Sequence, residues 1–141
     1  ADPSRGSART GELMSGFHTF NGVDPWPIFP GVGLNAVAGD QVFLGHVRYE
    51  AGTTVKLHSH EHTEQAMLVL AGSVEVTIGD ETRELFAGDT CVINRTVEHA
   101  LYSPSGVTFI EALAPVPLDH IPDRERDLLL GDLGGSLHVE R

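Results

Sequence analysis

Apolar residues alternate with polar ones along most of the chain after Gln41. A period of two is typical of β-strands, in which successive side chains point to opposite faces. Turn-forming residues interrupt the pattern at regular intervals, as at Ala51-Gly52, Ala71-Gly72 and Gly79-Asp80. The pattern therefore predicts an all-β fold, an antiparallel sandwich or barrel, from eight short strands at 42–50, 53–58, 65–70, 73–78, 82–86, 90–94, 99–103 and 107–113.

The ends of the chain do not follow this alternation. Residues 1–13 are small, polar and aperiodic, which predicts a disordered tail or expression remnant before Met14. We expect one domain over 14–122, with a short helix at 123–130 within a C-terminal tail, 123–141. The proline-rich stretch 22–33 predicts an irregular loop or a short edge segment, whose two large aromatic side chains cap the core.

Composition narrows the class of protein. A chain of 141 residues fits one domain, and no apolar stretch approaches the ~20 residues of a membrane helix. Its net charge of −11 argues against nucleic acid and anionic membranes as partners, because both are held mainly by cationic side chains. Cys91, the single cysteine, excludes an internal disulfide and fits a cytoplasmic location; we expect it to be buried and inert.

The stretch His58 to Gly72 holds the clearest chemical signal. His58 and His60 are two apart, so on a strand their side chains share a face, and His99 begins a later predicted strand. Neutral imidazole is a preferred ligand of Zn, Ni, Cu and Fe. The alternative for these three residues is a hydrogen-bonded polar cluster without a metal. His62 has the same parity, but we expect it to be a solvated loop residue.

These residues resemble the two sequence motifs of the cupin superfamily. The first motif, G-x5-H-x-H-x3,4-E-x6-G, matches Gly52, His58, His60, position 65 and Gly72. In the second, G-x5-P-x-G-x2-H-x3-N, Gly88 and His99 match, whereas Asn94, Thr96 and Ser103 depart from the family pattern.

The resemblance spans residues 41–113 and implies a jelly-roll barrel, a double-stranded β-helix. It also implies one divalent transition metal ion (Zn, Ni, Fe or Mn) held by His58, His60, Gln65 and His99. Counting back from Gly72 places Gln65, not Glu64, at the family's carboxylate position, and Glu64 has the opposite parity. The alternative for Gln65 is a residue that hydrogen-bonds next to a three-histidine site.

The alternation of side chains between the two faces of a strand suggests further residues around the site. Glu111, on an apolar face with Phe109, is our candidate general acid/base, the alternative being an ion pair with Arg48. His46 could reach the site from a neighbouring strand or be a buried structural histidine. Lys56 shares the parity of His58, and could bind an acidic substrate or be solvated. Met67 and Val69 continue the Gln65 face, and Leu101 and Ser103 that of His99.

Three functions are compatible with this site. The first is a metal-dependent enzyme acting on a small oxygenated metabolite without redox chemistry, by isomerisation, ring opening or cyclisation. The others are an Fe(II)-dependent dioxygenase and a binding or sensor protein without turnover. By motif, the chain is similar to uronate-linearising and polyketide-cyclase-type cupins. We expect a small-molecule substrate and a homodimer, because short strands leave edges that pairing protects.

Overall fold

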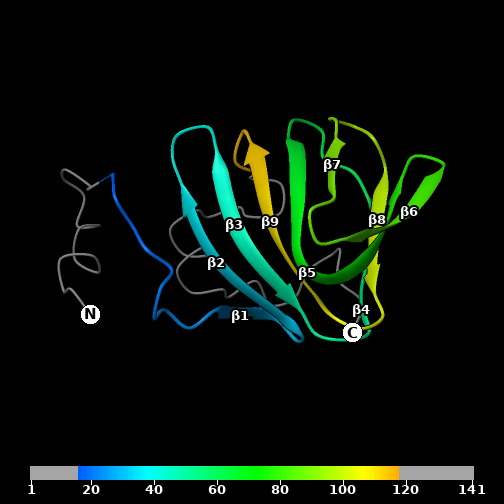
Figure 1. The fold of residues 1–141 in the computed structure, drawn as a ribbon. Helices are drawn as coiled ribbons and strands as arrows, with labels where there is room; N and C mark the ends of the chain where they lie inside the picture. The colour runs from blue at the N-terminus through cyan, green and yellow to red at the C-terminus, as the bar shows by residue number, and fades with distance from the viewer. Residues whose placement is uncertain (1–15, 118–141) are drawn as a thin grey trace.

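The computed structural model describes residues 16–117, which form a strongly curled antiparallel β-structure (Figure 1). It contains nine strands, and β5, at Glu64–Ile78, is by far the longest. The other eight are β1 (Trp26–Phe29), β2 (Val32–Ala38), β3 (Phe43–Tyr49), β4 (Thr53–His58), β6 (Glu81–Phe86), β7 (Thr90–Ile93), β8 (His99–Ser103) and β9 (Val107–Ala114).

Strand β5 belongs to both layers of the barrel. Its first half pairs with β9 and β7, which continues the layer β1-β2-β3-β9. Its second half pairs with β6 and β8, and β8 pairs with β4 to complete the other layer. Since every pairing is antiparallel and the strands curl around a common interior, the predicted jelly-roll barrel is confirmed.

The predicted turn at Ala71-Gly72 is wrong, because the chain continues there as one strand. The pairing of β5 with β9 shifts register between Val69 and Ala71, and Gly72 has a φ of 76°. A Cβ atom at Gly72 would lie 2.2 Å from the carbonyl oxygen of Gly106. A glycine and a bulge thus let β5 bend from one layer into the other without ending.

The proline-rich stretch is more regular than the sequence predicts. It supplies β1 and the first residues of β2, and β1 lies at the edge of its layer. Proline is tolerated at an edge because its missing N–H faces no partner strand. Phe29 packs against the core as expected, and Trp26 is half-buried. The predicted tail at 1–13 and helix at 123–130 lie outside the described residues.

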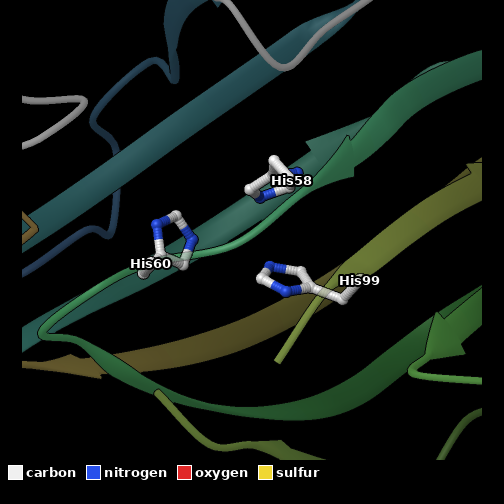
Figure 2. Close-up of side chains that lie close together, drawn as sticks. All are labelled: His58, His60 and His99. Carbon is white, nitrogen blue, oxygen red and sulfur yellow. The ribbon is translucent and has the colours of Figure 1, made fainter. Parts of the chain in front are cut away.

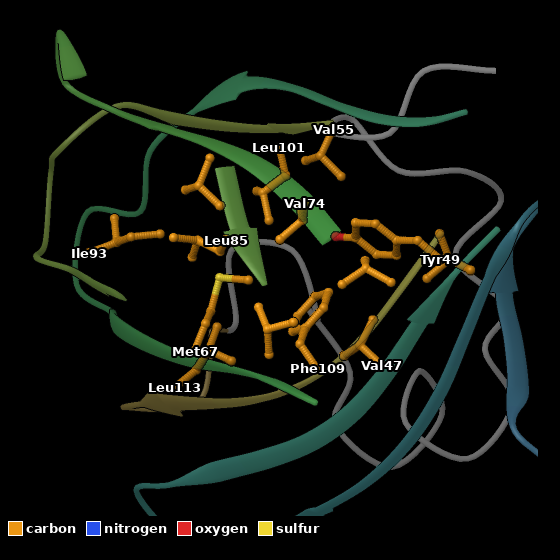
Figure 3. Packing of buried hydrophobic residues seen from close by; sticks show 14 of the residues in the cluster. Val47, Tyr49, Val55, Met67, Val74, Leu85, Ile93, Leu101, Phe109 and Leu113 are labelled. Carbon is orange, nitrogen blue, oxygen red and sulfur yellow. The ribbon is translucent and has the colours of Figure 1, made fainter. Parts of the chain in front are cut away.

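The inward faces of both layers meet in one apolar core (Figure 3). Tyr49 on β3 and Phe109 on the neighbouring strand β9 form an edge-to-face pair with ring centroids 5.2 Å apart. Met67 and Val69 are buried on the inner face of β5, as predicted. Within residues 16–117, no helix is long and apolar enough to cross a membrane.

Candidate metal centre

Three histidines from two distant parts of the sequence converge at one end of the interior (Figure 2). His58 ends β4, His60 follows two residues later, and His99 begins β8. One nitrogen from each ring can be chosen so that all three lie within 4.8 Å of one another. The pairing of β4 with β8 places His58 directly opposite His99, which brings the two sequence motifs together.

A bulge in β4 turns His58 inward. Val55 pairs with Leu101 and His58 pairs with His99, so three steps along β4 match two steps along β8. Val55 is in the core, and without the extra residue His58 would point to the opposite face. The bulge therefore converts a position of outward parity into one that faces the interior.

Hydrogen bonds to the main chain orient two of the rings. His58 Nδ1 lies 2.8 Å from the carbonyl oxygen of Lys56, and His99 Nδ1 lies 3.0 Å from that of Val97. A carbonyl oxygen only accepts, so both Nδ1 atoms carry the proton and donate it. In the neutral rings the lone pair is then on Nε2, which is the arrangement typical of metal-binding histidines.

His99 provides the test of whether a metal ion fits these residues. Its Nε2 is buried and, in the part of the chain that the structure describes, is the one buried side-chain nitrogen or oxygen without a hydrogen-bond partner. Burial, with smaller effects from His58 and His60, lowers the pKa of His99 to about 4. The ring therefore stays neutral near pH 7, with an unsatisfied lone pair between two other imidazoles, and a divalent ion would satisfy it.

The loop before His99 also positions His60. The backbone N–H of Thr96 donates to the carbonyl oxygen of His60 at 2.7 Å, which ties this loop to the segment after β4. Thr96 has a φ of 69°, the left-handed conformation that glycine adopts most easily. This is the position at which the second cupin motif has glycine, so the backbone conformation is present although the residue differs.

Gln65, which is buried, and Glu111, which is half-buried, form a polar pair on the inward faces of β5 and β9. Gln65 Nε2 donates to Glu111 Oε1 at 3.3 Å, whereas Glu64 is exposed on the outer face, as its parity predicts. Burial raises the pKa of Glu111 to about 7. Burial, and then the negative charge of Glu111, also raise the pKa of the Tyr49 hydroxyl.

Two predicted pocket residues lie elsewhere. His46 is on the outer face of β3 with Leu44, because the inward residues of this strand are Phe43, Val47 and Tyr49. The expectation that His46 reaches the site is therefore wrong in this structure. Lys56 is exposed, and it does not share the face of His58, since the bulge between them breaks the alternation.

Four further expectations can be compared with the structure. His62 is exposed and lies 3.6 Å from Glu61 Oε1. Leu101 and Ser103 are buried on the face of His99. Cys91, which was expected to be buried, is half-buried and packs against the core; burial raises the pKa of its thiol, which makes it a poor nucleophile. Arg48, the alternative partner of Glu111, is on the outer face of β3.

Two contributors were not predicted from the sequence. The first is Tyr49, whose hydroxyl is affected by the charge of Glu111. It alternates in phase with Phe43 and Val47 on the bulkier face of β3, and this pattern would have indicated an inward side chain. No sequence pattern indicates that Thr96 holds His60, because that contact joins two loops.

Comparison with known proteins places this site in a family. The family model described as "Cupin domain" matches residues 45–111, which include the histidines, Gln65 and Glu111. Residues 45–111 of the chain form a cupin domain. A search of curated proteins found no match.

Solved structures share the fold of this cupin. KdgF from Halomonas sp. is 24% identical, with a TM-score of 0.69, covering 75% of this chain and 98% of that one. An RmlC-like cupin from Shewanella frigidimarina is 21% identical, with a TM-score of 0.68, covering 74% and 95%. A predicted oxalate decarboxylase from Thermotoga maritima is 16% identical, with a TM-score of 0.54, covering 60% and 81%. Sequence identities this low support a shared fold, and the activity has to be argued from the residues of the site.

Proposed function

We propose that this cupin is a metal-dependent enzyme that acts on a small oxygenated metabolite by isomerisation, ring opening or cyclisation, without redox chemistry. The observation that carries the proposal is the buried, unpartnered Nε2 of His99 beside His58 and His60. Such an atom costs free energy unless a ligand satisfies it.

The residues that would hold the ion are His58, His60 and His99, with Gln65 as the fourth. Main-chain carbonyl groups hold the rings of His58 and His99 through Nδ1, and the Nε2 of His99 has no hydrogen-bond partner. Because the Nε2 of Gln65 donates to Glu111, the amide oxygen of Gln65 is the group left to act as a ligand. A divalent ion with four neutral ligands keeps its full charge and would polarise a carbonyl or hydroxyl oxygen of the substrate.

Glu111 is the residue that would move the proton. Its Oε1 accepts the hydrogen bond from Gln65, which leaves Oε2 to hold or release a proton. A pKa of about 7 suits this role, because both protonation states are then populated near neutral pH. Phe109, Val69 and Met67 exclude water from the barrel interior on the side of Glu111.

The cytoplasmic location belongs to the same proposal. It is supported by the single cysteine of the sequence, Cys91, which is half-buried and has no second cysteine with which to form a disulfide. The substrate is expected to be a free small molecule rather than a polymer of nucleotides, given the net charge of −11.

The test starts from protein purified without a histidine tag. Metal analysis should find one divalent ion per chain, and the zinc-substituted protein should convert a substrate from a panel of sugar acids, lactones and polyketide-like diketones without oxygen. Activity that requires both iron and O₂ would show that the dioxygenase alternative is correct. Retention of the metal with no turnover of any panel member, but tight binding of one, would favour a sensor.

A further inference from the structure

Tyr49 carries its hydroxyl group into the interior of the barrel. It lies on the inward face of β3, beside Val107 of β9, and only 8% of the residue is exposed. In Figure 3 its ring lies next to Phe109, and its oxygen points toward Val74 among the apolar side chains of the core. A tyrosine buried in this way usually has a hydrogen-bond partner for its O–H group.

The other buried hydroxyl groups of the barrel all have such a partner. Within residues 16–117 these belong to Thr53, Thr63, Ser73 and Ser103, and their partners are main-chain carbonyl oxygens or, for Ser73, the hydroxyl of Ser105. The Tyr49 oxygen is the exception, since it forms no hydrogen bond with the described part of the chain. Its partner must therefore be a molecule other than this protein.

A small molecule can reach the Tyr49 oxygen. Among the described residues, His99 Nε2 is the one unbonded side-chain nitrogen or oxygen that has no accessible surface. The Tyr49 oxygen is unbonded too, so it retains accessible surface, and its direction in Figure 3 places that surface inside the barrel. The interior therefore leaves a space beside this oxygen.

Glu111 borders the same interior space. Its Oε1 accepts a hydrogen bond from Gln65, whereas its Oε2 has no partner in residues 16–117 and so retains accessible surface as well. Burial, and then the negative charge of Glu111, raise the pKa of the Tyr49 hydroxyl. The hydroxyl consequently keeps its proton at neutral pH and presents an O–H donor to the space.

Gln65, Glu111 and Tyr49 lie at increasing distances from the histidines. Strand β9 pairs with the strands that carry the other two residues, so that Leu113 lies beside Gln65 and Val107 beside Tyr49, with Glu111 between these levels. A molecule that contacts both the histidine end and Tyr49 must therefore extend along the barrel. A ligand that only fills the coordination sphere of an ion would not reach the hydroxyl.

We propose that the Tyr49 hydroxyl binds a second oxygen of the substrate, one that does not contact the metal ion. This inference rests on the proposed function and adds a specificity-determining residue to it. The oxygen belongs to an uncharged hydroxyl or carbonyl group, because a neutral O–H donates to either, whereas the apolar surroundings of Val74 and Phe109 would penalise a charged group. The substrate class is thus a metabolite with oxygens at two separate positions.

Tyr49→Phe, with Tyr102→Phe as the matched control, tests this inference. These are the two tyrosines of the chain, and Tyr102 is 40% exposed on the outer face of β8. Both variants should bind Zn²⁺ like the wild type, and Tyr49→Phe should resist urea no less, since it loses no hydrogen bond within the protein. For the panel member that the zinc-loaded wild type binds most tightly, Tyr49→Phe should raise Kd roughly 10-fold. Tyr102→Phe should leave this Kd unchanged.

Analogues of that panel member, each lacking one oxygen, identify the group that Tyr49 binds. The wild type should bind one of these analogues roughly 10-fold more weakly than the parent, whereas Tyr49→Phe should bind this analogue and the parent alike. Equal losses in both proteins would mean that Tyr49 holds only a water molecule, and would overturn the inference.

Failure of this inference can be distinguished from failure of the proposed function. Turnover with a wild-type Kd in Tyr49→Phe would overturn the role of Tyr49 and leave the metal-dependent enzyme standing. Binding that depends on Tyr49, without turnover of any panel member, would support the role of Tyr49 and overturn the enzyme.

Discussion

His58 at the end of β4 lies directly opposite His99 at the start of β8, with ring centroids 4.2 Å apart. Two positively charged imidazoles at this distance would repel each other, and His99 is kept neutral by burial. In both rings the Nδ1 proton is donated to a main-chain carbonyl oxygen, of Lys56 for His58 and of Val97 for His99. The Nε2 of His99, which has no hydrogen-bond partner, then lies next to the ring of His58.

Removal of one of these rings should abolish metal retention. We expect His58→Ala to lower the affinity for Zn²⁺ roughly 100-fold or more, since loss of a ligand exceeds the 10–100-fold cost of losing a residue that only orients one. Competition with a chromophoric chelator measures the affinity. His62→Ala is the control, because His62 is exposed and lies next to Glu61, and it should bind Zn²⁺ like the wild type. Equal losses in both variants would contradict the assigned ligands.

Gln65→Glu should tighten metal binding. A carboxylate in place of the amide adds a negative charge to a neutral ligand set, and we expect roughly 10-fold or more, equal to about 1.4 kcal/mol. The same charge should slow turnover, because it weakens polarisation of the substrate oxygen. Glu64→Gln, on the outer face of the same strand, should change neither property. Unchanged metal affinity in Gln65→Glu would mean that Gln65 only hydrogen-bonds next to the site.

Glu111 should make the metal-free protein less stable as the pH rises. Its pKa is about 7 in the folded chain against 4.5 for an unperturbed glutamate, so between these values the folded state holds a proton that the unfolded state has lost. Stability is then highest below pH 4.5 and falls as the pH rises through 7, by about 3 kcal/mol at most from this residue.

Urea unfolding in excess chelator, from pH 5 to pH 8, measures this effect. Glu111→Gln has no carboxyl group at this position, so its free energy of unfolding should fall less steeply with pH than that of the wild type. Glu64→Gln should keep the slope of the wild type. If the free energy of unfolding depends on pH in the same way in the wild type and in Glu111→Gln, the pKa of Glu111 is not raised in the folded chain.

Gly72→Ala should destabilise the barrel severely. The added Cβ atom would lie 2.2 Å from the Gly106 carbonyl oxygen, and the backbone there has a φ of 76°. We expect a loss of roughly 3 kcal/mol or more, as for other large steric conflicts. Gly79→Ala is the matched control: its φ is 62°, but nothing lies within 4 Å of the new Cβ atom. It should cost only about 1 kcal/mol for the backbone conformation. Thermal unfolding of both variants separates the cost of the steric conflict from the cost of the backbone conformation. Similar losses of stability in the two variants would contradict this explanation.

Local alternation in the sequence determined most of the barrel and much of the site. The inward positions of β9, with Phe109 and Glu111, follow from period two, because a regular strand keeps its side chains on fixed faces. The same rule separated Gln65 from Glu64. The spacing of His58, His60 and His99 identified the histidine cluster, since the cupin motifs fix which positions meet.

Tertiary structure decided the features that depend on contacts between strands. The bulge that turns His58 inward and leaves Lys56 outside arises from the pairing of β4 with β8, which a single strand does not encode. The continuation of β5 through Gly72 depends on the close approach of Gly106. The outward position of His46 depends on which face of β3 meets the core. The Nε2 of His99 is unsatisfied only because packing removes water from it. Burial, rather than residue type, therefore makes this histidine a candidate ligand.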